Sequence, residues 1–298
     1  MKMKRRKRTS VANVTFVTVN TIILVLFCVI TLYPILNTLA ISLNEGLDAN
    51  RGGIYLLPRK FTLENYFTVF TRDNLVTAIK VSVARTVIAT FLHMFVTALL
   101  AYVLSRKEFL FNKQLSLFYV LTMYINGGLV PTLLLYKDLH LSNSFWVYII
   151  PGAVSAFNMI VIRTYMNGLP DSLVESAQVD GAGHLKIFIR IILPLCKPVM
   201  ATVALFIAVY QWNSWFDAML YNMGRPDLTT LQYELQKLLS SVSQQSGSAS
   251  TMKNAANAVT PISIRSATAI VTALPIVCLY PFLQRYFVSG LTIGGVKE

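Results

Sequence analysis

Apolar residues run through this 298-residue chain in long stretches, and polar residues gather between them. A helix that crosses a bilayer needs about 20 mainly apolar residues, and six stretches meet that requirement. The pattern therefore predicts an all-α membrane protein with six transmembrane helices. The predicted spans cover residues 14–43, 75–104, 115–136, 144–166, 198–221 and 266–288.

Positive charge indicates which side the ends face. Six of the first eight residues are basic, namely Lys2, Lys4, Arg5, Arg6, Lys7 and Arg8. Lys and Arg mark cytoplasmic segments, so the basic N-terminus, residues 1–13, is expected inside, and an even number of spans returns the tail 289–298 to the same side. A cleaved signal peptide is the alternative. The first apolar run is about twice the usual length for one, and no clear A-x-A site follows it.

The connections then alternate between the two sides. Residues 105–114 and 167–197 are expected in the cytoplasm, and residues 44–74, 137–143 and 222–265 outside. Only 13% of the residues are charged, against about a quarter in ordinary globular domains. The net charge of +13 lies mostly in the ends and loops. It therefore indicates topology and contact with membrane lipid rather than nucleic acid.

The chain lacks the usual patterns of catalytic and metal sites. Cys28, Cys196 and Cys278 are scattered, with no metal-binding or disulfide spacing. No GxxxxGK[ST] phosphate loop occurs. We therefore expect no metal, no cofactor and no catalytic residues, and if ATP powers the protein, another chain hydrolyses it.

Ionisable residues interrupt the second predicted span. A charge at the centre of a bilayer costs a few kcal/mol or more, so Lys80 and Arg85 are expected near the outer surface, facing headgroups or protein. His93 fits a satisfied polar group between helices better than a proton carrier. In the fifth span, Asp217 shows no obvious partner in the sequence.

The loop 167–197 reads as two short helices joined by a turn. Ser172 and Glu175 form an S-x-x-E capping box pattern before about two helical turns, and Gly181 with Gly183 breaks the helix. A second helix, 184–192, places four apolar residues on one face and is expected to end at Pro194. Those four are Leu185, Phe188, Ile189 and Ile192. Such a helical pair suits docking into a groove on a soluble partner.

The segment 175–198, ESAQVDGAGHLKIFIRIILPLCKP, resembles the conserved cytoplasmic loop of carbohydrate-type, binding-protein-dependent ABC importers. That loop reads E-A-A, three residues, G, nine residues, I-x-L-P, and Ser176 is the one departure from it. The matching residues are Glu175, Ala177, Gly181, Ile191, Leu193 and Pro194. The stretches 126–132, 151–158 and 286–297 resemble the branch that imports oligosaccharides or polysaccharide fragments, alginate-type systems included.

The resemblance implies a permease subunit in the bacterial inner membrane, paired with a second six-span permease. Two ATPase subunits would bind below, and an extracytoplasmic binding protein would deliver an oligosaccharide from above. The residues expected to couple this chain to the ATPase are Glu175, Ser176, Ala177, Asp180, Gly181, Leu193 and Pro194. Glu175 would pair with a basic group there, and Ala177 and Gly181 would permit close approach.

The candidate sugar pathway lies in the fifth span, at Tyr210, Trp212, Asn213 and Trp215. An aromatic belt with a helix–helix hydrogen bond from Asn213 is the competing interpretation. In the third span, Gly127 and Gly128 indicate either a broken helix or close packing, and packing is preferred.

Residues 222–265 are expected to meet the binding protein through their flank at 221–236. A short amphipathic helix is predicted over 228–239, followed by a flexible low-complexity stretch at 240–250. Three other functions stay open: an ABC permease for peptides or polyamines, an ion-gradient-driven secondary transporter, and a membrane scaffold.

Overall fold

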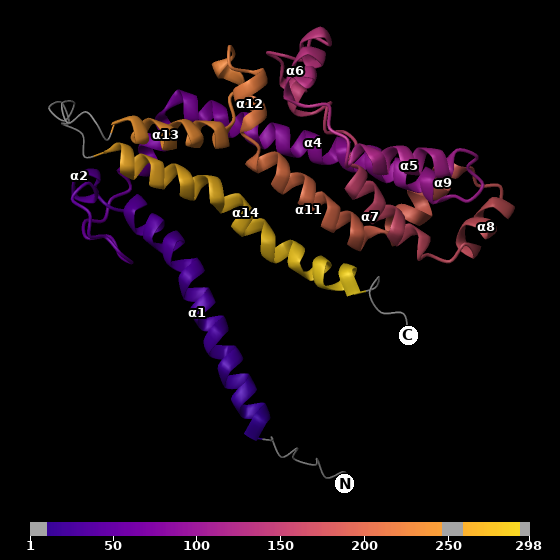
Figure 1. Cartoon of the computed structure of the whole chain (residues 1–298), viewed down its shortest axis with the longest axis horizontal. Coiled ribbons are helices and arrows are strands. Elements are labelled where there is room, and N and C mark those ends of the chain that lie inside the picture. Colours follow the sequence, from indigo (N-terminus) through magenta and orange to yellow (C-terminus); the bar gives the residue numbers. More distant parts are fainter. Residues whose placement is uncertain (1–10, 246–258, 293–298) are drawn as a thin grey trace. The chain divides into compact units, whose positions relative to one another are not determined.

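The computed structural model describes residues 11–245 and 259–292 (Figure 1). The basic cluster within residues 1–8, the end of the low-complexity stretch (246–250) and the last six residues lie outside the described ranges. The regular secondary structure of the described chain is helical, apart from one isolated bridge between Asn44 and Phe61. It divides into two units, residues 1–69 with 245–270 and residues 70–244 with 271–298.

Three helices of the described chain are long and apolar enough to cross a membrane. They are α1 (Val11–Ser42), α4 (Asp73–Ser105) and α14 (Pro261–Thr292). These helices coincide with the first, second and sixth predicted segments. The runs are strongly apolar, and any proline inside them, such as Pro34 in α1, leaves the helix unbroken.

The other three predicted segments are interrupted, so six continuous helices are not found among the described residues. A further apolar pair of helices, 184–195 and 197–213, is bent by 85°. Each interruption coincides with Gly, Asn or Ser, which favour turns over helix interiors. The pieces are α5 (Asn112–Thr122) and α6 (Leu129–Asp138), η1 (Phe145–Tyr148) and α7 (Ala156–Asn167), and α11 (Lys197–Asn213) and α12 (Phe216–Tyr221).

The preference for close packing at Gly127 and Gly128 is wrong. A Cβ added to Gly127 would meet no atom within 4 Å, and Gly128 adopts a left-handed φ of +88°. The Asn126 side-chain oxygen accepts a hydrogen bond from the Gly128 N–H at 2.9 Å. These residues therefore form a turn that breaks the helix.

In the first unit, the connection after α1 is held by polar side chains. It contains α2 (Gly46–Ala49) and the start of α3 (Glu64–Thr71). The buried Asn65 amide donates to the carbonyls of Ser42 and Asn44 at 2.9 and 2.8 Å. Hydrogen bonds from Asn44 and Arg59 hold the pKa of Asp48 below its usual value.

In the second unit, α4, α7 and α11 pack around a common core. Small residues of α4, Ala98 and Ala101, are completely buried there and let the neighbouring helices approach closely. Met159 and Ile162 of α7 and Val203 of α11 fill the space opposite. This bundle carries both candidate sites described below.

The amphipathic segment of the 222–265 connection docks onto the same unit. After η3 (Pro226–Leu228), α13 (Leu231–Gln245) buries Leu231 and Leu235, and the Leu231 N–H donates to the Ser82 hydroxyl at 2.8 Å. The helix begins three residues later than predicted. It also continues through residues 240–245, the first part of the low-complexity stretch, where no glycine or proline interrupts the chain before Gly247.

Candidate functional site

The predicted helix–turn–helix of residues 171–195 is present. Helix α8 (Ser172–Val179) is followed by a turn and then by α9 (His184–Ile187), the π-helix η2 (Phe188–Ile192) and α10 (Leu193–Leu195). Gly181 adopts a left-handed φ of +76° in that turn, a conformation that glycine adopts without strain. The predicted glycine break is therefore confirmed at Gly181.

The predicted capping box is absent. Asp171 is the N-cap residue of α8, Ser172 is already inside the helix, and neither side chain accepts a capping hydrogen bond. The Asp171 carboxylate instead accepts a hydrogen bond from Lys107 at 2.8 Å. That hydrogen bond holds the pKa of Asp171 below its ordinary value and raises the pKa of Lys107.

The four apolar residues expected on one face of the second helix are divided between a buried and an exposed side. Ile187, Phe188 and Ile192 are buried, whereas Leu185 and Ile189 are exposed. The wider π-helical turn at Phe188–Ile192 rotates the following residues relative to an ideal α-helix. The helix was predicted to end at Pro194, but it continues to Leu195. An 85° bend then leads into α11.

The inward face of this loop is part of the bundle core. Val174 and Ala177 of α8 join Phe188 in one cluster with residues of α4, α7 and α11. The Phe188 ring lies 5.2 Å from the Tyr102 ring of α4, centroid to centroid. The loop therefore shares one tightly packed core with the helices behind it.

The outward face combines acidic and apolar groups. Val179 is 88% exposed, and Leu185 is 62% exposed. Glu175 and Asp180 are also exposed, and their carboxylates make no hydrogen bond or ion pair within the described chain. Both remain available to a partner.

The structure divides the seven predicted coupling residues between the two faces. Glu175, Ser176, Asp180, Gly181 and Pro194 are exposed. Ala177 is buried against the bundle, and Leu193 is half-buried beside the same core. These last two are therefore placed to position the loop rather than to contact a partner.

The four candidate sugar-pathway residues do not share one surface. Tyr210 is 70% exposed and lines a cavity. Trp212 is buried, and its indole N–H donates to the Thr272 carbonyl of α14 at 2.8 Å. Asn213 donates to Val209 in its own helix, and Trp215, half-buried, lies edge-on to Phe216. Because α11 ends at Asn213, the residues on either side of the break point differently.

The structure contains a buried ionic network that the sequence did not predict. Arg85 of α4 is 1% exposed, and its guanidinium donates to Asp217 at 2.6 and 3.2 Å and to Gln211 at 2.7 and 3.1 Å. The guanidinium carbon also lies 4.3 Å from the centroid of the Tyr148 ring. Asp217 therefore has a partner, contrary to expectation, and Arg85 faces protein. The only sign of this pair in the sequence was that two predicted spans each contained one charge, of opposite sign.

His93 fulfils the prediction of a satisfied polar group. Its Nε2 atom lies 2.7 Å from the Ile149 carbonyl oxygen, which can only accept a hydrogen bond. Within the described residues, no group of three His, Cys, Asp or Glu side chains is arranged to hold a metal ion.

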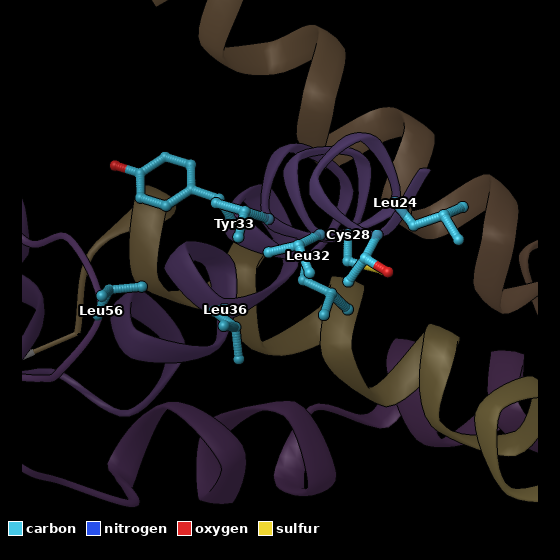
Figure 2. A pocket seen from close by; sticks show the side chains of 9 residues that line it. Leu24, Cys28, Leu32, Tyr33, Leu36 and Leu56 are labelled. Atoms are coloured by element: carbon cyan, nitrogen blue, oxygen red, sulfur yellow. The ribbon is translucent and has the colours of Figure 1, made fainter. Parts of the chain in front are cut away.

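Helix α1 carries a separate apolar groove of about 490 Å³. Figure 2 shows Tyr33 and Leu36 on α1 near Leu56 from the following connection, with Leu24, Cys28 and Leu32 further along the same helix. Nearly all its lining is hydrocarbon, so it suits lipid chains or another apolar helix.

Residues 6–293 match the family described as the binding-protein-dependent transport system inner membrane component. A polygalacturonan/rhamnogalacturonan transport system permease of Bacillus subtilis (strain 168), YtcP, is 35% identical over 274 residues, covering 92% of this chain and 95% of that protein. Protein LplC of the same organism is 36% identical over 271 residues, covering 90% of each.

Among solved structures, a chain of a bacterial ABC transporter that imports the acidic polysaccharide alginate superposes with a TM-score of 0.83. It is 26% identical and covers 93% of this chain and 98% of its own length. The family match extends over nearly all of the sequence, including the bundle and the loop of residues 171–195. This chain therefore belongs to the family of inner membrane components of binding-protein-dependent transport systems.

Proposed function

We propose that this chain is the transmembrane permease subunit of an ATP-driven importer of oligosaccharides in the bacterial inner membrane. It pairs with a second six-span permease, receives substrate from an extracytoplasmic binding protein and is driven by two ATPase subunits. Its six spans comprise the three continuous helices and the three interrupted segments, with both termini in the cytoplasm.

The two-faced loop of residues 171–195 carries this proposal. Its inner face is locked into the α4–α7–α11 core, and its outer face presents unpaired carboxylates next to exposed apolar side chains. A groove on a soluble ATPase binds such a surface through charge and apolar contact. ATP-driven movement of that groove then rocks the bundle through the buried face.

In this arrangement, Glu175, Ser176, Asp180 and Gly181 contact the ATPase, and Pro194 lies at the exposed end of the loop. Ala177 and Leu193 act behind them by fixing α8 and α10 to the core. Close approach of the ATPase, which the sequence assigned to both Ala177 and Gly181, is therefore proposed for Gly181 alone. The space beside Gly181 is open, since a Cβ there would meet no other atom of the described chain within 4 Å.

The cargo is inferred from relatives whose names specify polygalacturonan/rhamnogalacturonan and arabinooligosaccharides. The α1 groove supports burial of that helix against lipid or the second permease, since its most apolar 18-residue window is 0% buried against the rest of the described chain. The flank at 221–236 is the proposed contact with the binding protein, and Met223 there is 73% exposed.

A secondary transporter is disfavoured because its expected proton-carrying groups are already engaged. Asp217 is paired with Arg85, and His93 is hydrogen-bonded to a backbone carbonyl. Uptake sensitive to vanadate, and insensitive to collapse of the proton gradient, separates the two mechanisms.

The decisive experiment compares Glu175→Arg and Gly181→Asp with Glu64→Arg, an exposed charge reversal in the connection after α1. We expect wild-type amounts of all three variants in the membrane. Glu175→Arg and Gly181→Asp should lose oligosaccharide uptake, whereas Glu64→Arg should retain it. Normal uptake by both loop variants would refute the coupling role, and equal loss in the control would make the effect nonspecific and refute it as well.

A further inference from the structure

A cavity of about 440 Å³ lies among α4, the η1–α7 segment and α11. Its volume falls within the range of about 300–1,000 Å³ usual for small-molecule sites. Tyr210 is the one predicted pathway residue that lines it. The other lining residues used here are His93, Gly152, Ser155, Asn158 and Phe206.

Asn158 is the most informative of these residues. It is 8% exposed, and its backbone N–H donates to the Ser155 hydroxyl at 3.3 Å, which caps α7. Its side-chain amide makes no hydrogen bond within the described chain. The amide is therefore free to hydrogen-bond a molecule that enters the cavity. An amide both donates and accepts, as does a hydroxyl group.

The rest of the lining carries no formal charge. It contains no Lys, Arg, Asp or Glu. The His93 ring is held by its hydrogen bond to the Ile149 carbonyl. Gly152 leaves room for the ring, since an added Cβ would lie 2.9 Å from it. A carboxylate entering this cavity would lose its hydration without meeting a cation, which is unfavourable. An uncharged ligand has no such penalty.

Aromatic rings supply the second half of the match. Phe206 and Tyr210 come from the same face of α11, four residues apart, and both remain partly or largely exposed. The two aromatic rings can contact the C–H face of a sugar ring, while the Asn158 amide can hydrogen-bond the sugar hydroxyls.

We propose that this cavity is a binding subsite for an uncharged sugar ring, in which Asn158 hydrogen-bonds two hydroxyls and Phe206 and Tyr210 contact the ring face. The inference rests on the proposed oligosaccharide import and narrows it. Whatever acidic units a transported chain carries, the unit held here is neutral.

The test uses the full-length chain, extracted with its co-purifying subunits into lipid nanodiscs, and saturation-transfer NMR. The probes are neutral galactobiose, mannobiose and cellobiose, together with digalacturonate and dimannuronate. We expect at least one neutral disaccharide to bind, and its uronate counterpart to compete at least about tenfold more weakly. Asn158→Ala should weaken neutral binding about tenfold, consistent with the loss of two hydrogen bonds.

Two further variants keep the test decisive. Asn167→Ala removes the same side chain at an exposed position of α7 and should bind like wild type. Tyr210→Ala, at an exposed position that tolerates truncation, should also weaken binding if Asn158→Ala fails to fold. The subsite is refuted if no neutral probe binds, if uronates compete equally, or if the folded cavity variants bind normally. Should Glu175→Arg still abolish uptake in that case, the importer function stands and the subsite alone falls.

Discussion

Two ion pairs of this chain have similar lengths but very different surroundings. Arg85 and Asp217 approach to 2.6 Å with side-chain exposures of 1% and 22%, whereas Lys107 and Asp171 lie 2.8 Å apart with exposures of 87% and 58%. The first ties α4 to the break between α11 and α12. The second lies beside the two-faced loop in open surroundings, where ion pairs contribute little. Polar groups in the first region therefore hold the fold, and those in the second are exposed where a partner can reach them.

The largest expected effect is the loss of one member of the buried pair. Arg85→Leu leaves Asp217 and Gln211 without their donor, and such losses cost about 3–5 kcal/mol. We expect a large drop in the melting temperature of the detergent-solubilised protein, measured by scanning fluorimetry.

The double variant Arg85→Leu/Asp217→Leu is the control for that measurement. Removing both charges leaves neither unpaired, so its melting temperature should recover toward wild type. If Arg85→Leu melts at the wild-type temperature, the network does not stabilise the fold, and the contrast between the two regions disappears.

The next effect tests whether the inner face of the loop also belongs to the fold. Phe188→Ala opens a cavity beside Tyr102 and should destabilise the protein by about 3 kcal/mol. Ile189→Ala changes the adjacent, exposed residue and should alter the melting temperature far less. Equal losses would contradict the division of the loop into a buried and an exposed face.

A smaller effect is expected at the junction of α11 and α14. Trp212→Phe removes the hydrogen bond to Thr272 while retaining most of the apolar volume, at a cost of about 1 kcal/mol. The matched control is Trp215→Phe, because the Trp215 indole makes no hydrogen bond within the described residues. Thermal melting of both variants should show a shift in Trp212→Phe alone.

The sequence predicted features that depend on neighbouring residues. Unbroken apolar runs located α1, α4 and α14, and Gly181 located the turn after α8. Apolar content did not show that the segment 115–136 breaks, because the same residues suit one long helix or two short ones. That choice depended on the turn made by Asn126 and Gly128.

Features that depend on distant residues escaped prediction for a different reason. Arg85 and Asp217 are 132 positions apart, and no local pattern encodes their meeting. The expected capping box is absent because the helix begins at Ser172, after the N-cap residue Asp171, whose carboxylate binds Lys107, 64 positions away. Likewise, the cavity at Asn158 is assembled from three helical segments, and no local pattern joins Asn158 to His93 or Tyr210.

The smallest expected effect concerns the exposed pair, and salt and pH make it informative. Lys107→Ala should leave the melting temperature at neutral pH nearly unchanged. The lowered pKa of Asp171 means that any contribution is present above its ordinary 3.8 and is lost as the pH falls through the lower folded value. The raised pKa of Lys107 means that its contribution is present below 10.5 and is lost as the pH rises through the higher folded value.

Any small difference between Lys107→Ala and wild type should therefore persist between these pH limits and vanish in about 1 M salt, where the screening length is about 3 Å. The Arg85→Leu loss should persist in the same salt, because the Arg85 guanidinium is buried and buried pairs are screened much less than exposed ones. A salt-resistant Lys107→Ala effect would show that burial does not separate the two regions.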